Sequence, residues 1–148
     1  MNKHKYAKDI SDLDCNCTPS ENYVAEDKVA YRWVHSDINH PYNFIPVLKI
    51  SPNRIDNFEN CEEKCQGYGL SLFNDFKKAE KRLTSFLKRK PLLAKTLGNA
   101  IAEGTIEKSE GIAGKSDIRG HFTFHEDESC DLKPKFTIVK QINNWTKI

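Results

Sequence analysis

The sequence predicts a small α+β domain, with a mixed but mostly antiparallel sheet and two consecutive helices in the middle of the chain. Three observations lead to this class. Runs of aromatic and β-branched residues come before residue 74, helical apolar patterns occupy the middle, and two more strand-like runs follow residue 120. Strands, then helices, then strands are typical of α+β proteins rather than of a regular strand–helix alternation.

The first half of the chain contains two predicted strands. Residues 29–35 are rich in aromatic and β-branched residues, and residues 67–73 form a short apolar run. Between them, residues 44–50 are expected to be extended but irregular, because Pro46 cannot donate to a sheet ladder. The polar residues 51–66 are predicted to hold at most a short helix near residues 57–65.

The clearest predicted helix spans residues 74–90. Apolar residues recur on it at intervals of three and four, which gives one apolar face; they are Phe76, Ala79, Leu83, Phe86 and Leu87. Asn74 or Asp75 is placed to cap this helix, and Pro91 ends it. A second helix is then predicted from Pro91 to about Glu103, closed by Gly104.

Two closing strands are predicted at residues 121–126 and 135–142. The turn at residues 128–134 favours their antiparallel pairing. The chain of 148 residues suits one domain. We therefore predict a flexible N-terminal arm over residues 1–22 and a single globular domain over residues 23–148.

Composition argues against several functional classes. The net charge is only +2, from 23 basic and 21 acidic residues, which disfavours a protein that mainly coats nucleic acid. No apolar run approaches the roughly 20 residues of a membrane span. The N-terminus lacks the apolar segment of a secretory signal. Five cysteines cannot all pair within one chain, and free thiols in a reducing cytoplasm are the simplest interpretation.

Three polar residues lie on or at the ends of predicted strands and make up a candidate catalytic set: Arg32, Ser71 and Glu126. An arginine can form two parallel hydrogen bonds to a phosphate or hold a ribose. A serine between a strand and a helix can hold a ribose hydroxyl. A glutamate can stabilise a developing oxocarbenium ion, as carboxylates do in sugar hydrolysis.

These residues resemble the pattern of the ADP-ribosyltransferase superfamily and its small toxin-like relatives. The resemblance covers about residues 29–128 and includes Gly-Tyr-Gly-Leu-Ser-Leu-Phe at residues 67–73, followed by Ala79. It implies that NAD is the substrate, with Arg32 on a phosphate or ribose and Ser71 at the nicotinamide ribose. The family's Ser-Thr-Ser triplet is absent, and Phe124 stands where a second glutamate precedes the catalytic one.

The same resemblance implies that Glu126 stabilises the charge at the anomeric carbon. The predicted NAD contacts are Arg32, Tyr68, Ser71, Phe73 and His121, with Tyr31 as a further stacking surface. His121 and His125 fall on one face of the closing strand, with Phe122 and Phe124 on the other. Two histidines at this spacing could bind a metal, share acid–base catalysis, or simply face solvent on the exposed side of the strand.

Two other classes stay open. The chain also fits a non-enzymatic accessory or interaction subunit of a larger bacterial complex, with residues 142–145 as a docking element. A zinc-stabilised nucleic-acid-binding module is the third alternative; its thiolate ligands would be Cys15, Cys17, Cys61 and Cys65. Lysines and arginines along the predicted first helix would then contact phosphates.

Overall fold

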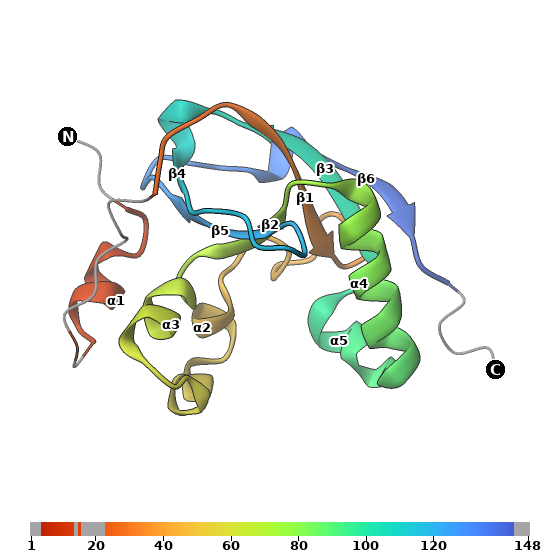
Figure 1. Ribbon diagram of the computed structural model, residues 1–148, viewed down its shortest axis with the longest axis horizontal. Helices are drawn as coiled ribbons and strands as arrows, with labels where there is room; N and C mark the ends of the chain where they lie inside the picture. The colour runs from red at the N-terminus through yellow and green to blue at the C-terminus, as the bar shows by residue number, and fades with distance from the viewer. Residues whose placement is uncertain (1–3, 14, 16–22, 144–148) are drawn as a thin grey trace.

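The computed structural model describes residues 4–13, 15 and 23–143 and consists of one six-stranded sheet with helices (Figure 1). The strand order is β4-β5-β2-β1-β3-β6, and every pairing is antiparallel. The strands are β1 (Lys28–Val34), β2 (Leu70–Phe73), β3 (Ala100–Ile106), β4 (Gly111–Ala113), β5 (His121–Glu126) and β6 (Phe136–Gln141). The α+β class predicted from the sequence is confirmed.

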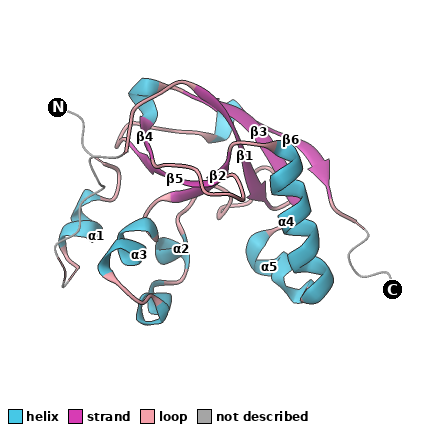
Figure 2. Cartoon of the chain, in the orientation of Figure 1, coloured by secondary structure: helices cyan, strands magenta, loops and turns pink. Residues whose placement is uncertain are grey.

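The helices gather below the sheet in two groups, as Figure 2 shows. One group contains α2 (Val47–Ile50) and α3 (Cys61–Gln66), and the other contains α4 (Phe76–Arg89) and α5 (Ala94–Leu97). A short α1 (Ala7–Ser11) lies beside the first group, where its Asp9 pairs with Lys49 of α2 at 3.4 Å. Four 3-10 turns complete the elements: η1 (Pro52–Asn57), η2 (Pro91–Leu93), η3 (Lys108–Glu110) and η4 (Lys133–Lys135).

Helix α4 confirms the predicted amphipathic pattern. Asp75 caps it by accepting a hydrogen bond from the backbone nitrogen of Lys78 at 2.9 Å. The predicted apolar face is buried against the sheet, where it joins Phe73 and Ile101 in one core. The buried helix residues are Ala79, Leu83 and Leu87. This packing fixes α4 over one half of the sheet.

A second core joins the two halves of the sheet. Leu70, Leu72 and Phe122 from β2 and β5 pack in the same cluster as Ala30 and Ala102 from β1 and β3. The backbone pairing between the halves is much weaker, because β1 and β2 share the single register pair Tyr31–Phe73. The two central strands therefore diverge beyond this pair, although their side chains share a core.

The prediction that the second helix reaches Glu103 is wrong. The helical segment ends at Leu97, and residues 100–106 form β3, which pairs with β1 and β6. Gly98 makes the turn with a φ of 83°, and a Cβ there would lie 2.1 Å from the Val34 carbonyl oxygen. The helix propensity of Ala100 and Ala102 is overridden because such small side chains fit a strand buried between two neighbours.

Two smaller predictions are also corrected. The closing strands β5 and β6 do not pair with each other; β5 lies between β4 and β2, and β6 pairs with β3 at the opposite edge. The segment predicted to be extended at residues 44–50 instead contains α2, which begins directly after Pro46. Proline suits a helix start because its missing N–H would have no partner there.

The N-terminal segment is tied to the domain. Cys15 and Cys61 form a disulfide, which corrects the interpretation of unpaired thiols for these two residues, and Cys130 is free and buried. Cys17 and Trp145 lie outside the described residues, so the predictions that rest on them stay predictions. No helix within the described ranges combines the length and apolarity that a membrane span requires.

Candidate functional site

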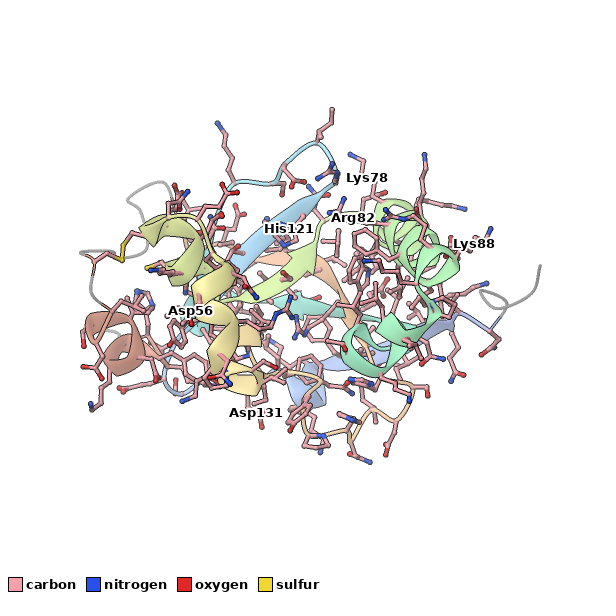
Figure 3. The ribbon with its side chains drawn as sticks, turned by 90° about the horizontal axis from the view of Figure 1, so that it is seen from below. Asp56, Lys78, Arg82, Lys88, His121 and Asp131 are labelled. Carbon is pink, nitrogen blue, oxygen red and sulfur yellow. A yellow bond between two sulfur atoms is a disulfide. The ribbon has the colours of Figure 1, made fainter. Side chains whose placement is uncertain are left out.

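A cleft opens on the helical side of the sheet, between the two helix groups (Figure 3). Its floor is formed by β1, β2 and β5, and its walls by α2 and η1 on one side and α4 and α5 on the other. The cavity volume is about 290 Å³. It lies where β1 and β2 diverge, so the split in the sheet gives the cleft its depth.

The charged side chains that line this cleft are all cationic. Arg32 comes from the floor, Arg54 from η1 and Arg82 from α4, and no carboxylate is among the lining residues in the part of the chain that the structure describes. Within that part, none of the three guanidinium groups forms a direct ion pair. Three arginines without a direct ion-pair partner among the described residues give the cleft a positive potential.

Arg32 bridges the gap between the diverging strands. Its Nε donates to the carbonyl oxygen of Asn43 at 2.6 Å, and its Nη1 donates to the carbonyl oxygen of Ser71 at 2.9 Å. Burial lowers the pKa of Arg32 to about 10, while the Glu126 carboxylate opposes this shift. The guanidinium is therefore charged at neutral pH, and three of its five N–H groups are left for a ligand.

Asn43 fixes the loop that accepts this bond. The side chain is 2% exposed, accepts from the backbone nitrogen of His35 at 2.7 Å, and donates to the carbonyls of Asp37 and Ile38 at 2.9 and 3.2 Å. All of its hydrogen bonds close the loop between β1 and α2. The Asn43 carbonyl is thus held in place to orient Arg32.

Aromatic rings form much of the wall between the sheet and α4. Trp33 stacks on Phe73 with 5.0 Å between centroids and meets Phe86 edge-on at 5.7 Å. The indole nitrogen of Trp33 donates to the Ala79 carbonyl at 3.0 Å, which joins β1 to α4. Arg82 lies over the Phe86 ring, 4.9 Å from its centroid. Flat apolar surfaces and cationic groups therefore stand side by side.

A serine and a histidine meet at the floor of the cleft. Ser71 Oγ lies 2.8 Å from His121 Nε2, and both residues line the cavity. Asp117 contacts His121 at the backbone and lies near its second ring nitrogen. Its Oδ1 accepts from the His121 backbone nitrogen at 3.0 Å, and its Oδ2 lies 4.0 Å from His121 Nδ1. Burial lowers the pKa of His121, Asp117 opposes the shift, and Arg82 adds to it.

The structure brings together four of the predicted site residues and leaves out three. Arg32, Ser71, Phe73 and His121 all line the cleft. Glu126 and Tyr68 are not among its lining residues. Tyr31 does not line it either, and packs edge-on against Phe76 with 5.9 Å between ring centroids.

Glu126 is held in a buried polar cluster with the N-terminal segment. Its Oε2 lies 2.9 Å from Lys5 Nζ, and Lys5 also donates to the Cys130 carbonyl. The Glu126 residue is 4% exposed. Its Oε1 has no hydrogen-bond partner among the described residues. Burial raises the pKa of Glu126, and the hydrogen bond from Lys5 opposes the rise.

The structure does not test the zinc hypothesis directly. Among the described residues, no group of three or more histidine, cysteine or acidic side chains is arranged to hold a metal. Cys15 and Cys61, two of the four predicted ligands, are joined to each other, so they are not thiolates in this state. A zinc site made of the four cysteines stays a prediction for the reduced protein.

Sequence reasoning missed several residues that shape the cleft: Asn43, Arg54, Arg82 and Asp117. Arg82 belongs to the run of lysines and arginines along the helix, and nothing in its spacing distinguishes it from its lysine neighbours. Asp117 carries a local signal, since Asp117 and Gly120 enclose a four-residue turn directly before β5. Asn43 and Arg54 have no comparable signal.

In comparisons with known proteins, no family model, curated protein or solved structure matches the chain.

Proposed function

We propose that this chain is a nucleotide-binding domain whose cleft takes a phosphorylated ligand of the NAD or ADP type. The observation that carries the proposal is the charge of the cleft, which is lined by three arginines and by no carboxylate from the described residues. Arginine binds phosphate oxygens through paired hydrogen bonds, and its charge persists when it is partly buried. An anion is the ligand class that completes such a site.

The aromatic walls narrow the class further. Trp33 and Phe86 provide aromatic surface next to Arg82, which suits a ligand with both a ring and phosphate groups. The volume of about 290 Å³ lies at the lower end of small-molecule sites. We therefore expect the cleft to hold one nucleotide unit, with the rest of a dinucleotide extending beyond it.

ADP-ribosyl transfer remains a more specific hypothesis that rests on the family resemblance. That reaction calls for a carboxylate at the glycosidic bond, and Glu126 lies with Lys5 rather than along the cleft. Binding depends only on the arginines and the aromatic walls. The cleft therefore supports nucleotide binding without Glu126, whereas ADP-ribosyl transfer requires a carboxylate that the cleft lining does not include among the described residues.

Thermal unfolding with and without ligand tests the proposal. A ligand at 100 times its dissociation constant stabilises the folded state by about 2.7 kcal/mol, which corresponds to a rise of roughly 5 to 10 °C for a chain of this size. We expect this rise with ADP or NAD but not with adenosine, which lacks phosphate. E126Q should keep the ADP-induced rise. An equal response to adenosine, or no response to ADP at millimolar concentration, would contradict the proposal.

A further inference from the structure

The contact between Ser71 and His121 has the geometry of a nucleophile and its base. Ser71 is exposed to the cleft, and its Oγ lies 2.8 Å from His121 Nε2, within the range for proton transfer along a hydrogen bond. Ser71 follows Leu70 on β2 and pairs with Thr123 on β5, so the backbone of two strands holds the serine in place.

The charges around His121 favour the tautomer that a base needs. Asp117 Oδ2, 4.0 Å from Nδ1, is too distant for a hydrogen bond but attracts a proton to Nδ1. The Nε2 lone pair is then free to accept the Ser71 hydroxyl proton. Burial and, to a smaller extent, Arg82 on α4 lower the pKa of His121 although Asp117 opposes them, so the imidazole is neutral at pH 7.

The turn before β5 holds this arrangement rigidly. The Gly120 nitrogen donates to the Asp117 carbonyl at 3.0 Å, and the Asp117 nitrogen donates to the His121 carbonyl at 2.9 Å. Gly120 has a φ of 77°, and a Cβ there would come 2.7 Å from Asn74 Oδ1. Phe73 packs edge-on against the His121 ring with 5.6 Å between centroids. His121 is therefore fixed from both the turn and the sheet.

We propose that Ser71 is a nucleophile for phosphoryl transfer, with His121 as its general base and Asp117 as the residue that positions His121. The inference rests on the proposed function, because the cleft arginines must hold the phosphate group next to Ser71. These arginines also supply the positive charge that stabilises a phosphoryl transition state.

The reaction has two balanced steps. In the first, Ser71 Oγ bonds to phosphorus and its proton passes to His121 Nε2, while the bond from phosphorus to the leaving oxygen breaks. The histidine then gives its proton to that leaving oxygen. In the second step, water attacks phosphorus and its proton passes to His121, the Oγ–phosphorus bond breaks, and Ser71 recovers its hydrogen from His121.

A fluorophosphonate probe tests this chemistry without knowledge of the natural substrate. A nucleophilic serine attacks the phosphorus of the probe, and fluoride leaves. Intact-mass spectrometry then detects the adduct, and peptide mapping locates it. We expect one adduct on Ser71 in the wild type and none there in S71A. The matched control S85A removes an exposed serine on α4 outside the cleft and should label at the wild-type rate. An unlabelled wild type, or an adduct on another residue, would overturn the proposal.

His121 is tested by substitution and by pH. H121Q should lower the labelling rate by about 100-fold or more. In the wild type the rate should rise with pH, then level off above a midpoint below pH 6.5, because neutral His121 is the base. D117N should move the midpoint to lower pH and R82Q to higher pH, since Asp117 raises and Arg82 lowers the histidine pKa. If H121Q fails to fold, the wild-type profile decides: a rate that keeps rising above pH 8 refutes His121 as base.

Protection by ADP separates this proposal from the nucleotide-binding proposal. If ADP slows the labelling of Ser71, the result supports both nucleotide binding and the Ser71 nucleophile. Labelling of Ser71 that ADP leaves unchanged, together with no thermal shift by ADP, refutes nucleotide binding and with it phosphoryl transfer from a nucleotide to Ser71, while the activated serine remains. A thermal shift by ADP without any labelling of the wild type refutes the nucleophile and leaves binding intact.

Discussion

The Arg32 guanidinium on β1 donates to the Ser71 carbonyl on β2 across a 2.9 Å hydrogen bond, at the place where the two strands diverge. The same side chain donates to Asn43 and lines the cleft. One residue thus closes the split in the sheet and presents a positive charge to any ligand in it. Stability and binding are coupled at this position.

We expect Arg32→Lys to weaken both properties. Lysine has one ammonium group and cannot reproduce the fork that reaches two carbonyls, so at least one charge-assisted hydrogen bond is lost. The free energy of unfolding should fall by about 1.5 to 3 kcal/mol. Urea unfolding measures this loss, and calorimetric titration with ADP measures the affinity.

Arg54→Gln is the matched control for Arg32. Arg54 lines the same cleft but is exposed, and its guanidinium forms no hydrogen bond within the described residues. Its substitution should weaken ADP binding and leave the urea midpoint unchanged. If R32K were as stable as the wild type, the bridge between the strands would not contribute to the fold.

His125 should make the protein less stable in mild acid. Its side chain is 2% exposed, and burial, aided by His4, lowers its pKa to about 4. Between pH 6.5 and 4 the unfolded chain binds a proton here that the folded chain does not, so stability falls as pH falls through this window. The loss at pH 4 is up to about 3 kcal/mol.

The comparison of wild type with H125Q isolates this contribution. Carboxylates titrate in the same window in both proteins, so the difference between their urea-unfolding curves reports His125 alone. The difference should narrow or reverse as the pH falls from 6.5 to 4. A difference that is constant with pH would show that His125 binds its proton equally well in the folded state.

The Cys15–Cys61 disulfide should stabilise the oxidised protein. It joins residues 46 positions apart, and the loop-entropy model gives about 4 kcal/mol for a loop of this length. Reduction, or Cys15→Ser, should therefore lower the thermal midpoint. A linked peptide containing both cysteines is expected after digestion of the oxidised protein without reductant.

The outcome also bears on the predicted cytoplasmic location. Disulfides persist mainly in oxidising compartments. If both thiols react with an alkylating reagent in protein purified under oxidising conditions, the bond does not form and the free-thiol interpretation regains support.

Local patterns in the sequence predicted the elements that carry their own signal. The aromatic and β-branched run predicted β1, the three- and four-residue spacing predicted α4, and the alternation at residues 121–126 predicted β5. β3 was misassigned because small residues such as Ala100 and Ala102 suit either state locally. Its pairing with β1 and β6 is a tertiary effect that one sequence does not encode at short range.

The candidate site was predictable in part for the same reason. Arg32, Ser71 and His121 lie on strands that were placed correctly, and the cleft brings them together. Glu126 is separated from His121 by five positions on one strand, so the two side chains face opposite sides of the sheet. Arg54 and Arg82 come from helical segments, and only the packing of those helices brings them to the cleft.

Arg82 and Arg89 provide the most direct test of a phosphate-binding cleft. Both stack on Phe86 from α4, with 4.9 and 5.0 Å to its centroid, but only Arg82 lines the cavity. Calorimetric titration of ADP into wild type, R82Q and R89Q therefore compares two similar arginines. We expect R82Q to bind about tenfold more weakly, a loss of about 1.4 kcal/mol, and R89Q to bind like the wild type. Equal affinity in all three proteins would contradict the account.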